Sequence, residues 1–320
     1  MQAIVPVSVT EPLFISQGAG ATDLAIRDRS ADLGYVAAQN DLVGALWDAQ
    51  RGGTLMSLMC MADKADYASP SAGACTVEYT LPDGSHEVSS SWPGRVRVAK
   101  VSPAWADIIA TADGPAMTVT DRWRIHSSCR LLRLQREIVM KTALAAADFC
   151  PLVIRLAPQF FDRVLPLGVG FTKDNEPPRG WLETWHSEGW YFAFSGDQAA
   201  AKDALAIAVG RLDGLRRIRY GFIPADDLPE AADPRLTGAL EDELQFRFRA
   251  QCDYPAALPN MFRGVVVPGW WRPGGRRIYR PGEKLSVEVL MAVARGLSWR
   301  YAQELALCEK YGLSISFGPE

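Results

Sequence analysis

The chain is poor in histidine and lysine and has no long apolar run, and each shortage excludes a class of protein. Only 3 of its 320 residues are histidine, and its six cysteines include no Cys-x-x-Cys pair. The small number of histidines and the spacing of the cysteines argue against a zinc site and favour buried free thiols.

No apolar stretch reaches the roughly 20 residues of a membrane-spanning helix. The N-terminus also lacks the pattern of a signal peptide. We therefore expect no membrane partner, and a cytoplasmic chain or a processed periplasmic one.

Charge and motif content exclude further classes. Lysines number 7 against 27 arginines, and the formal net charge is -3, so no global field attracts nucleic acid. The glycine-rich stretch 18–21 lacks the third glycine of a dinucleotide fingerprint, and no P-loop, GxSxG or HExxH pattern is present. The sequence therefore predicts no cofactor, no metal and no nucleic-acid partner.

Most of the chain is patterned as β-strands joined by tight turns. Apolar runs flank turn signals in four predicted hairpins, which span 40–62, 76–89, 107–140 and 204–223. Their turns contain Gly52-Gly53, Pro82-Asp83-Gly84, Asp113-Gly114 and Asp213-Gly214. Apolar and polar residues alternate strictly along 244–249, which is typical of a half-exposed strand. A period of two also runs along 118–125, and 285–293 is the last strong predicted strand.

This pattern predicts an all-β fold, a large antiparallel super-β-sandwich over residues 1–296. The clearest helix candidate is 298–311, with Ser298 as N-cap and Gly312 as C-cap. We therefore expect a short helical tail over 297–320. This tail could pack back on the sandwich or begin a further helical domain, and either a helical partner domain or a homo-oligomer is compatible with it.

A segment rich in tryptophan, 173–194, gives the strongest hint of function. Indole rings stack on the CH face of sugar rings, and neighbouring carboxylates can bind the hydroxyl groups. The segment therefore predicts a platform for an oligosaccharide or polysaccharide. Its aromatic candidates for substrate binding are Trp181, Trp185, Trp190 and Tyr191.

Three residues within this segment are the candidates for general acid and base. They are Glu183, His186 and Glu188. On an extended strand Glu183 would face away from the other two, whereas a loop would leave any geometry open. The alternative is a solvated loop whose tryptophans cover the edge of the sandwich.

A second aromatic cluster lies at 268–279 and alternates with arginine. Stacking rings beside guanidinium groups could bind a sugar acid or a single-stranded nucleic acid, and the acidic net charge disfavours the latter. The alternative is a bent loop tucked against the core. The candidate ligand contacts in this cluster are Trp270, Trp271, Arg272 and Tyr279.

Arginines recur on the predicted strands and leave two interpretations open. An arginine-lined sheet face could hold uronate carboxylates through paired hydrogen bonds. The favoured alternative is a solvated face whose arginines pair with Glu137, Glu241 and Glu243. The residues concerned are Arg122, Arg124, Arg133, Arg136, Arg247 and Arg249.

The run LVGALWDAQRGGTLMSLM resembles the opening hairpin of galactose-mutarotase-like β-sandwich domains. The later DRWRIHSSCRLLRLQREIVM and RPGEKLSVEVLMAV are similar to the long sheets of such domains, so the resemblance spans about residues 40–296. Domains of this kind accompany (α/α)-toroid domains in glycoside hydrolases and polysaccharide lyases. The resemblance therefore implies a carbohydrate-processing protein, or the β-sandwich portion of one.

Two departures from that family leave the activity open. A mutarotase is expected to use two histidines and a glutamate in an HxYF-like setting, whereas His186 stands in HSEGWYF, with an insertion before the aromatic pair. An aldose-epimerase-like activity would need His86 or His126 beside His186, with a carboxylate opposite. A non-catalytic carbohydrate-binding or structural module, packed against a helical partner, is the second hypothesis.

Overall fold

The structure is a computed structural model. It describes residues 24–61, 64–69, 73–127, 131–161, 163–167, 182–184, 189–194, 203–212, 217–223, 243–252 and 278–295. The described residues form three antiparallel sheets and three short 3-10 turns, so the predicted all-β antiparallel sandwich is confirmed. The predicted helix at 298–311 lies outside the described residues.

The first sheet has five strands in sequence order. They are β1 (Ala25–Arg29), β2 (Tyr35–Gln39), β3 (Val43–Asp48), β4 (Thr54–Cys60) and β5 (Ala65–Asp66). The 3-10 turn η1 (Ala49–Arg51) joins β3 to β4. Each neighbouring pair is antiparallel, as the hairpin signals predict.

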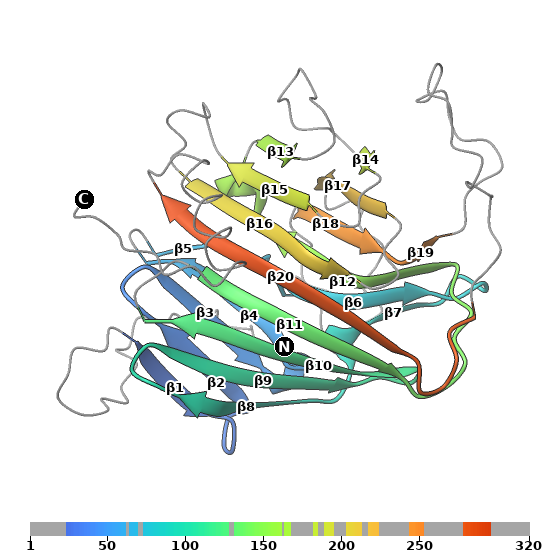
Figure 1. Cartoon of the computed structure of the whole chain (residues 1–320), viewed down its shortest axis with the longest axis horizontal. Coiled ribbons are helices and arrows are strands. Elements are labelled where there is room, and N and C mark those ends of the chain that lie inside the picture. Colours follow the sequence, from blue (N-terminus) through green and yellow to red (C-terminus); the bar gives the residue numbers. More distant parts are fainter. Residues whose placement is uncertain are drawn as a thin grey trace, which may run out of the picture.

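The second sheet has eight strands and is the longest layer of the molecule. In spatial order they are β13 (Arg163–Leu167), β15 (Gly189–Phe194), β16 (Asp203–Leu212), β20 (Lys284–Arg295), β11 (Leu131–Met140), β10 (Met117–His126), β9 (Trp105–Asp113) and β8 (Gly94–Val101). Figure 1 shows β20 lying beside β11, although the two strands are far apart in sequence.

The third sheet has seven strands. In spatial order they are β14 (Leu182–Thr184), β17 (Arg217–Ile223), β18 (Glu243–Arg249), β12 (Asp148–Leu156), β6 (Cys75–Thr80) and β7 (His86–Val88), with β19 (Gln251–Cys252) also paired to β12. Two further 3-10 turns, η2 (Ser89–Ser91) and η3 (Pro158–Phe160), follow β7 and β12.

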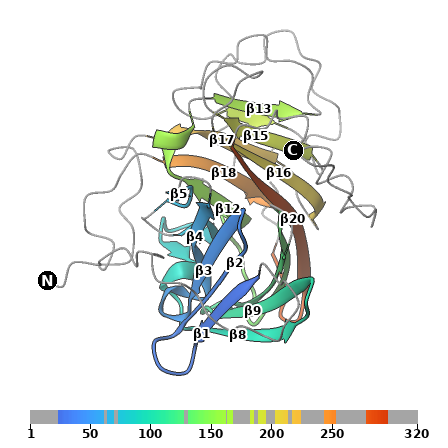
Figure 2. The same cartoon turned by 90° about the vertical axis from the view of Figure 1, so that its left-hand side faces the viewer.

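One core joins the three sheets. Its buried side chains come from β2, β3 and β4, from β9, β10, β11 and β20, and from β6, β12 and β18. Trp47 of β3 and Trp123 of β10 meet in its centre, with ring centroids 5.8 Å apart and both residues fully buried. Figure 2 shows the eight-stranded sheet curving from β8 and β9 past β20 to β15 and β13. The two smaller sheets therefore pack their apolar faces against its inner face.

Three of the four predicted hairpins are confirmed. The turn at Gly52-Gly53 joins β3 to β4, the turn at Gly84 joins β6 to β7, and the turn at Gly114 joins β9 to β10. Gly52, Gly53 and Gly84 have φ values of +62°, +69° and +88°. Glycine adopts this left-handed region without steric cost, which is why these turns are readable from sequence.

The fourth predicted hairpin, at 204–223, is wrong. β16 belongs to the eight-stranded sheet and pairs with β15 and β20, whereas β17 belongs to the seven-stranded sheet and pairs with β14 and β18. The chain therefore passes from one layer of the sandwich to the other between them. A turn signal marks a reversal of the chain, but the partner of each strand is set by the buried residues of β20 and β18, which lie far along the sequence.

Candidate functional site

The outer face of the eight-stranded sheet carries polar side chains in a regular array. On β10, Val119, Asp121, Trp123 and Ile125 point inward and are buried. The residues between them face outward, as do their cross-strand partners on β9, β11 and β20, because directly paired residues share a face of the sheet. We call this outward surface the polar face.

Three cross-strand rows define the polar face. The first row is Lys100, Asp107, Arg124, Arg133 and Leu290. The second is Arg97, Ile109, Arg122, Gln135 and Glu288. The third is Arg95, Thr111, Thr120, Glu137 and Ser286. Hydroxyl, amide, carboxylate and guanidinium groups therefore stand within one or two strand spacings of one another.

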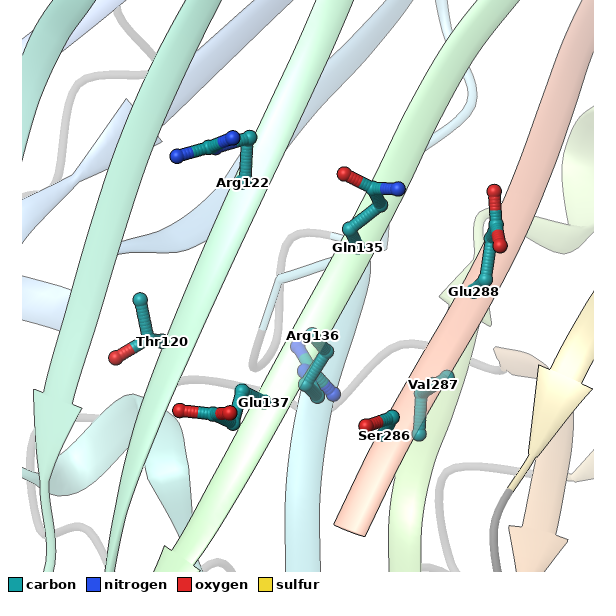
Figure 3. A pocket seen from close by; sticks show the side chains of 8 residues that line it. All are labelled: Thr120, Arg122, Gln135, Arg136, Glu137, Ser286, Val287 and Glu288. Carbon is teal, nitrogen blue, oxygen red and sulfur yellow. The ribbon is translucent and has the colours of Figure 1, made fainter. Parts of the chain in front are cut away.

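A shallow depression of about 330 Å³ lies on this face, where the second and third rows cross β10, β11 and β20. Six polar side chains project around it from these three strands, as Figure 3 shows: Thr120, Arg122, Gln135, Glu137, Ser286 and Glu288. Arg136 and Val287 also border it, but both are buried and belong to the inward-facing positions of their strands. The side chains that project over the depression can therefore form hydrogen bonds with a ligand.

The two carboxylates of the depression have cationic partners. Arg133 donates from Nε to Oε1 of Glu288 at 2.9 Å, and Lys284 Nζ lies 3.2 Å from Oε2 of Glu137. Both pairs are partly or fully exposed, so water screens them and each stabilises the fold little. Arg122 is exposed and has no ion-pair partner among the described side chains. Its guanidinium is therefore available to a ligand.

Further along the polar face, the ring of Trp105 contacts two cations. The Arg124 guanidinium carbon lies 4.1 Å from the centroid of the Trp105 ring, and Lys100 Nζ lies 5.0 Å from it. Arg124 in turn donates from Nε to Oδ1 of Asp107 at 2.7 Å and from Nη2 to Oδ2 at 3.1 Å. Cation–π contacts of this kind fix the ring and leave the face positively charged around it.

A second cluster of charged residues lies on the seven-stranded sheet, on the face opposite the core. At its centre is Glu78 of β6, which is fully buried. Thr76 Oγ1 donates to Glu78 Oε1 at 2.8 Å, and Arg247 Nη1 of β18 donates to Oε2 at 2.8 Å. Arg155 of β12 also pairs with Glu78, and donates from Nη1 to Thr76 Oγ1 at 2.7 Å. We call these residues the Glu78 cluster.

The arginines decide the charge of Glu78. Burial opposes ionisation of this carboxyl, but Arg155 and Arg247, with His86, outweigh that cost and hold the pKa of Glu78 well below its ordinary value. His86 Nε2 lies 3.6 Å from Glu78 Oε2, and His86 Nδ1 lies 3.0 Å from Thr80 Oγ1. Glu78 is therefore an ionised anchor that can orient His86, and the His86 side chain retains 18% exposure.

The sequence-predicted residues of the Trp-rich segment fall on two different sheets. Glu183 lies in β14 of the seven-stranded sheet, where its backbone pairs with Arg219, which pairs in turn with Arg247 of the Glu78 cluster. Trp190 lies in β15 of the eight-stranded sheet, in the row of Ala208, Leu290 and Arg133. Glu183 is therefore in register with the Glu78 cluster, whereas Trp190 is in register with the polar face.

Two further aromatic candidates are in register with the core. Tyr191 lies in the row of Ile207 and Met291, both fully buried. Tyr279 is itself fully buried, and its ring meets Phe149 edge-on at 5.1 Å. The remaining predicted site residues lie outside the described residues: Trp181, Trp185, His186, Glu188, Trp270, Trp271 and Arg272.

The predicted solvated arginine face needs correction at three positions. Arg136, Arg247 and Arg249 are buried. Their partners are Asp121, Glu78 and Asp148, so the predicted pairing with Glu137, Glu241 and Glu243 is wrong for these three arginines. Arg136 has the same parity along β11 as the buried Leu134 and Ile138, so it faces the core.

Sequence reasoning missed several residues of both sites. Glu78 alternates with the buried Cys75, Val77 and Tyr79, a signal that places it on one face of a strand but does not name its partners. Gln135 and Glu288 likewise alternate with buried neighbours. The pairing of β11 with β20 is what brings them together, and 155 residues separate Arg133 from its partner Glu288.

Within the described part of the chain, no three side chains from His, Cys, Asp or Glu gather closely enough to hold a metal ion. No helix there has the length and apolar character needed to cross a bilayer.

No protein-family model and no curated protein sequence matches the chain. Several solved structures do match the chain. A galactose mutarotase related enzyme from Lactobacillus acidophilus is 10% identical, with a TM-score of 0.44, and the match covers 81% of this chain and 97% of that one. A putative aldose 1-epimerase from Klebsiella pneumoniae is 10% identical, with a TM-score of 0.46 and coverage of 87% and 82%.

A longer enzyme also matches. The GH36 alpha-galactosidase from Geobacillus stearothermophilus is 10% identical, with a TM-score of 0.47. The match covers 85% of this chain but only 41% of that enzyme. These matches include both groups that the sequence resemblance named, galactose-mutarotase-related proteins and a glycoside hydrolase.

Proposed function

We propose that this chain is a carbohydrate-binding protein that holds a sugar in the depression of the polar face. The observation that carries the proposal is the lining of that depression, in which six outward polar side chains surround about 330 Å³. Hydroxyl, amide, carboxylate and guanidinium groups together supply both donors and acceptors. A sugar presents both on every hydroxyl group.

The size and chemistry of the depression favour a sugar over other small ligands. Small-molecule sites usually enclose about 300–1,000 Å³ and are mostly apolar. Here the volume lies at the low end, and the outward side chains around it are all polar. A hydrocarbon would displace water from Thr120, Arg122 and Gln135 without replacing its hydrogen bonds, which costs about 1–3 kcal/mol for each group that becomes buried. A polyhydroxylated ring satisfies them.

Trp190 extends the proposal to the Trp-rich segment. Its backbone stands in the row of Leu290 and Arg133, next to the row of Gln135 and Glu288. We propose that this segment adds an aromatic platform to the depression, with Trp181, Trp185, Trp270, Trp271 and Arg272 as further contacts. In a carbohydrate-processing enzyme of the glycoside hydrolase or polysaccharide lyase type, His186 and Glu188 would supply the acid and base beside this platform, whereas β14 carries Glu183 on the seven-stranded sheet.

A titration of intrinsic tryptophan fluorescence tests the binding proposal. The probes are neutral oligosaccharides of glucose, galactose and mannose, with product analysis of each mixture. We expect Gln135→Ala and Thr120→Val each to weaken binding roughly tenfold, since each loses about one hydrogen bond. Gln50→Ala, at an exposed position in η1, is the matched control. Equal affinity in all three variants and the parent chain would remove the depression as the site.

Product analysis separates an enzyme from a binding module. Turnover that disappears in Glu188→Gln, with binding retained, would establish catalysis by the Trp-rich segment. Binding without any product would identify a non-catalytic module that needs a partner domain.

A second candidate, an aldose-epimerase-like activity, rests on a different observation. His86 lies 3.6 Å from the ionised carboxylate of Glu78, with Arg155 and Arg247 beside it. An imidazole oriented by a buried carboxylate suits general acid–base catalysis. Polarimetry on freshly dissolved α-glucose and α-galactose tests it. An enzyme would show accelerated mutarotation that His86→Gln abolishes, and a rate equal to the buffer rate would discard this candidate.

A further inference from the structure

The polar face is strongly asymmetric in charge. Its half formed by β8, β9 and β10 carries five outward cations: Arg95, Arg97, Lys100, Arg122 and Arg124. The outward carboxylates of this half are Asp107 and Asp113, and each already has a cation, Arg124 and Lys141. The formal net charge of the whole chain is -3, so this surplus is local. We call the outward surface of β8, β9 and β10 the basic half.

Three of these cations have no anionic partner among the described side chains. Arg95, Arg97 and Arg122 are exposed, and none of the described carboxylates pairs with them. Arg97 and Arg122 stand in one cross-strand row with Ile109 between them. Two strand spacings therefore separate their backbones, roughly 10 Å. Both side chains are long and exposed, so their guanidinium groups can approach one anion that lies between the two strands.

The basic half runs directly into the depression. Arg122 is a member of both, and it stands beside Gln135 in the second row. On the other side of the depression the charges of Glu137 and Glu288 are balanced by Lys284 and Arg133. The uncompensated charge at the rim is therefore positive, and it comes from guanidinium groups, which bind carboxylates through two parallel hydrogen bonds.

We propose that the sugar bound on the polar face is acidic, a uronic-acid oligosaccharide whose carboxylates pair with Arg122 and Arg97. This inference rests on the proposed function, because it assigns a substrate class to the same depression. Gln135, Thr120 and Ser286 bind hydroxyl groups of one sugar ring. The arginines bind the carboxylates of that ring and of the next one toward β8.

Single-stranded nucleic acid is the competing polyanion, and the face suits it less well. Such binding depends on aromatic rings on which successive bases stack. Among the described residues, the outward aromatic side chain of the basic half is Trp105, and its ring is already in contact with Lys100 and Arg124. Hydroxyl-binding groups, in contrast, line the adjoining depression.

Isothermal titration calorimetry of the full chain tests the proposal with two matched probes. The first is oligogalacturonate, and the second is the same oligomer with its carboxylates methyl-esterified, which keeps the hydroxyl groups and removes the charge. We expect the acid to bind roughly tenfold to a hundredfold more tightly, as charge-assisted hydrogen bonds provide. Arg122→Gln should remove most of that preference and lower the affinity for the ester far less, because glutamine keeps a hydrogen-bond donor and loses only the charge. Arg29→Gln, on the five-stranded sheet, is the control and should change neither.

The outcomes separate this inference from the proposed function. Equal affinity for acid and ester, or a preference that survives Arg122→Gln and Arg97→Gln together, would overturn the acidic-sugar assignment and leave sugar binding intact. Tighter binding of a single-stranded DNA oligomer than of oligogalacturonate would also overturn it. No binding of acid, ester or any neutral oligosaccharide would overturn the proposed function, and the inference with it.

Discussion

Arg136 of β11 lies inside the sandwich with Asp121 of β10 as its counter-ion, and its Nε and Nη2 atoms are each 2.7 Å from a carboxylate oxygen. The same guanidinium donates from Nη1 to the carbonyl oxygens of Thr76, at 3.0 Å, and Pro151, at 2.9 Å. Pro151 stands where the register of β12 and β6 shifts, and proline cannot donate to a strand ladder. One arginine therefore links the two large sheets at an irregularity in the pairing.

Breaking this pair should destabilise the fold strongly. Asp121→Asn leaves a buried guanidinium without its counter-ion, and we expect the free energy of unfolding to fall by about 3–5 kcal/mol. Guanidinium chloride titration at pH 7 measures it. Glu288→Gln removes the partner of the half-exposed Arg133 and should cost less than about 1 kcal/mol. Equal losses in the two variants would show that Arg136 does not hold the two large sheets together.

Two glycines of the predicted turns should respond differently to the same substitution. Gly52 and Gly84 both have left-handed φ values, so alanine costs each about 1–2 kcal/mol. A Cβ on Gly52 would also lie 2.0 Å from the carbonyl oxygen of Ser89, whereas a Cβ on Gly84 meets no atom within 4 Å. We therefore expect Gly52→Ala to lower the melting temperature clearly more than Gly84→Ala in differential scanning calorimetry. Matching shifts would show that the approach of Ser89 can relax.

These turns illustrate what the sequence predicts well. A hairpin is local, so the residues that close it and the strands that it joins are adjacent, as at Gly52 and Gly84. The sheet change between β16 and β17 is not local. Ala206 of β16 pairs with Ala292 of β20, and that partner is chosen by packing across the whole chain. Alternation likewise predicts that Asp121 shares the inward face with Trp123. Its ion pair with Arg136, however, depends on the pairing of β10 with β11 and is seen only in the structure.

The candidate sites divide in the same way. Alternation along β10 and β11 places Arg122 and Gln135 on an outward face, so half of the polar face is readable from sequence. Glu288 joins them only through the pairing of β11 with β20. The aromatic signal of the Trp-rich segment drew attention to Glu183 and Trp190 as one group, whereas the backbone assigns them to different sheets.

Two buried cysteines should be inert in the folded protein. Burial raises the pKa of both Cys75 and Cys150 to about 12, and at Cys150 the neighbouring Asp148 adds to the shift. Both are free thiols, as the cysteine spacing predicts. Iodoacetamide reacts with thiolates, so at pH 8 we expect neither residue to be alkylated in buffer and both to be alkylated in urea. Peptide mass spectrometry reads this out, and labelling in buffer at the urea rate would contradict their burial.

The last prediction concerns the pH dependence that Glu78 gives to stability. Arg155 and Arg247 hold the pKa of this carboxyl well below its ordinary value against the cost of burial, so the folded state binds this proton more weakly than the unfolded state. A depressed pKa contributes stability that is present above the unfolded pKa, about 4.3, and is lost as the pH falls through the folded pKa. At pH 7, Glu78→Gln should therefore cost about 3–5 kcal/mol, since it leaves two buried guanidinium groups without their anion. The difference in unfolding free energy between parent and variant should shrink as the pH is lowered below about 4, and urea titrations at pH 7, 5, 4 and 3 measure it.

Glu137→Gln, at an exposed position, is the control and should cost little at every pH. A Glu78→Gln penalty that stays constant down to pH 3, in a chain that is still folded, would mean that Glu78 keeps its charge throughout that range. A penalty that vanishes already at pH 6 would mean that the carboxyl is protonated near neutrality and that the arginines do not govern it.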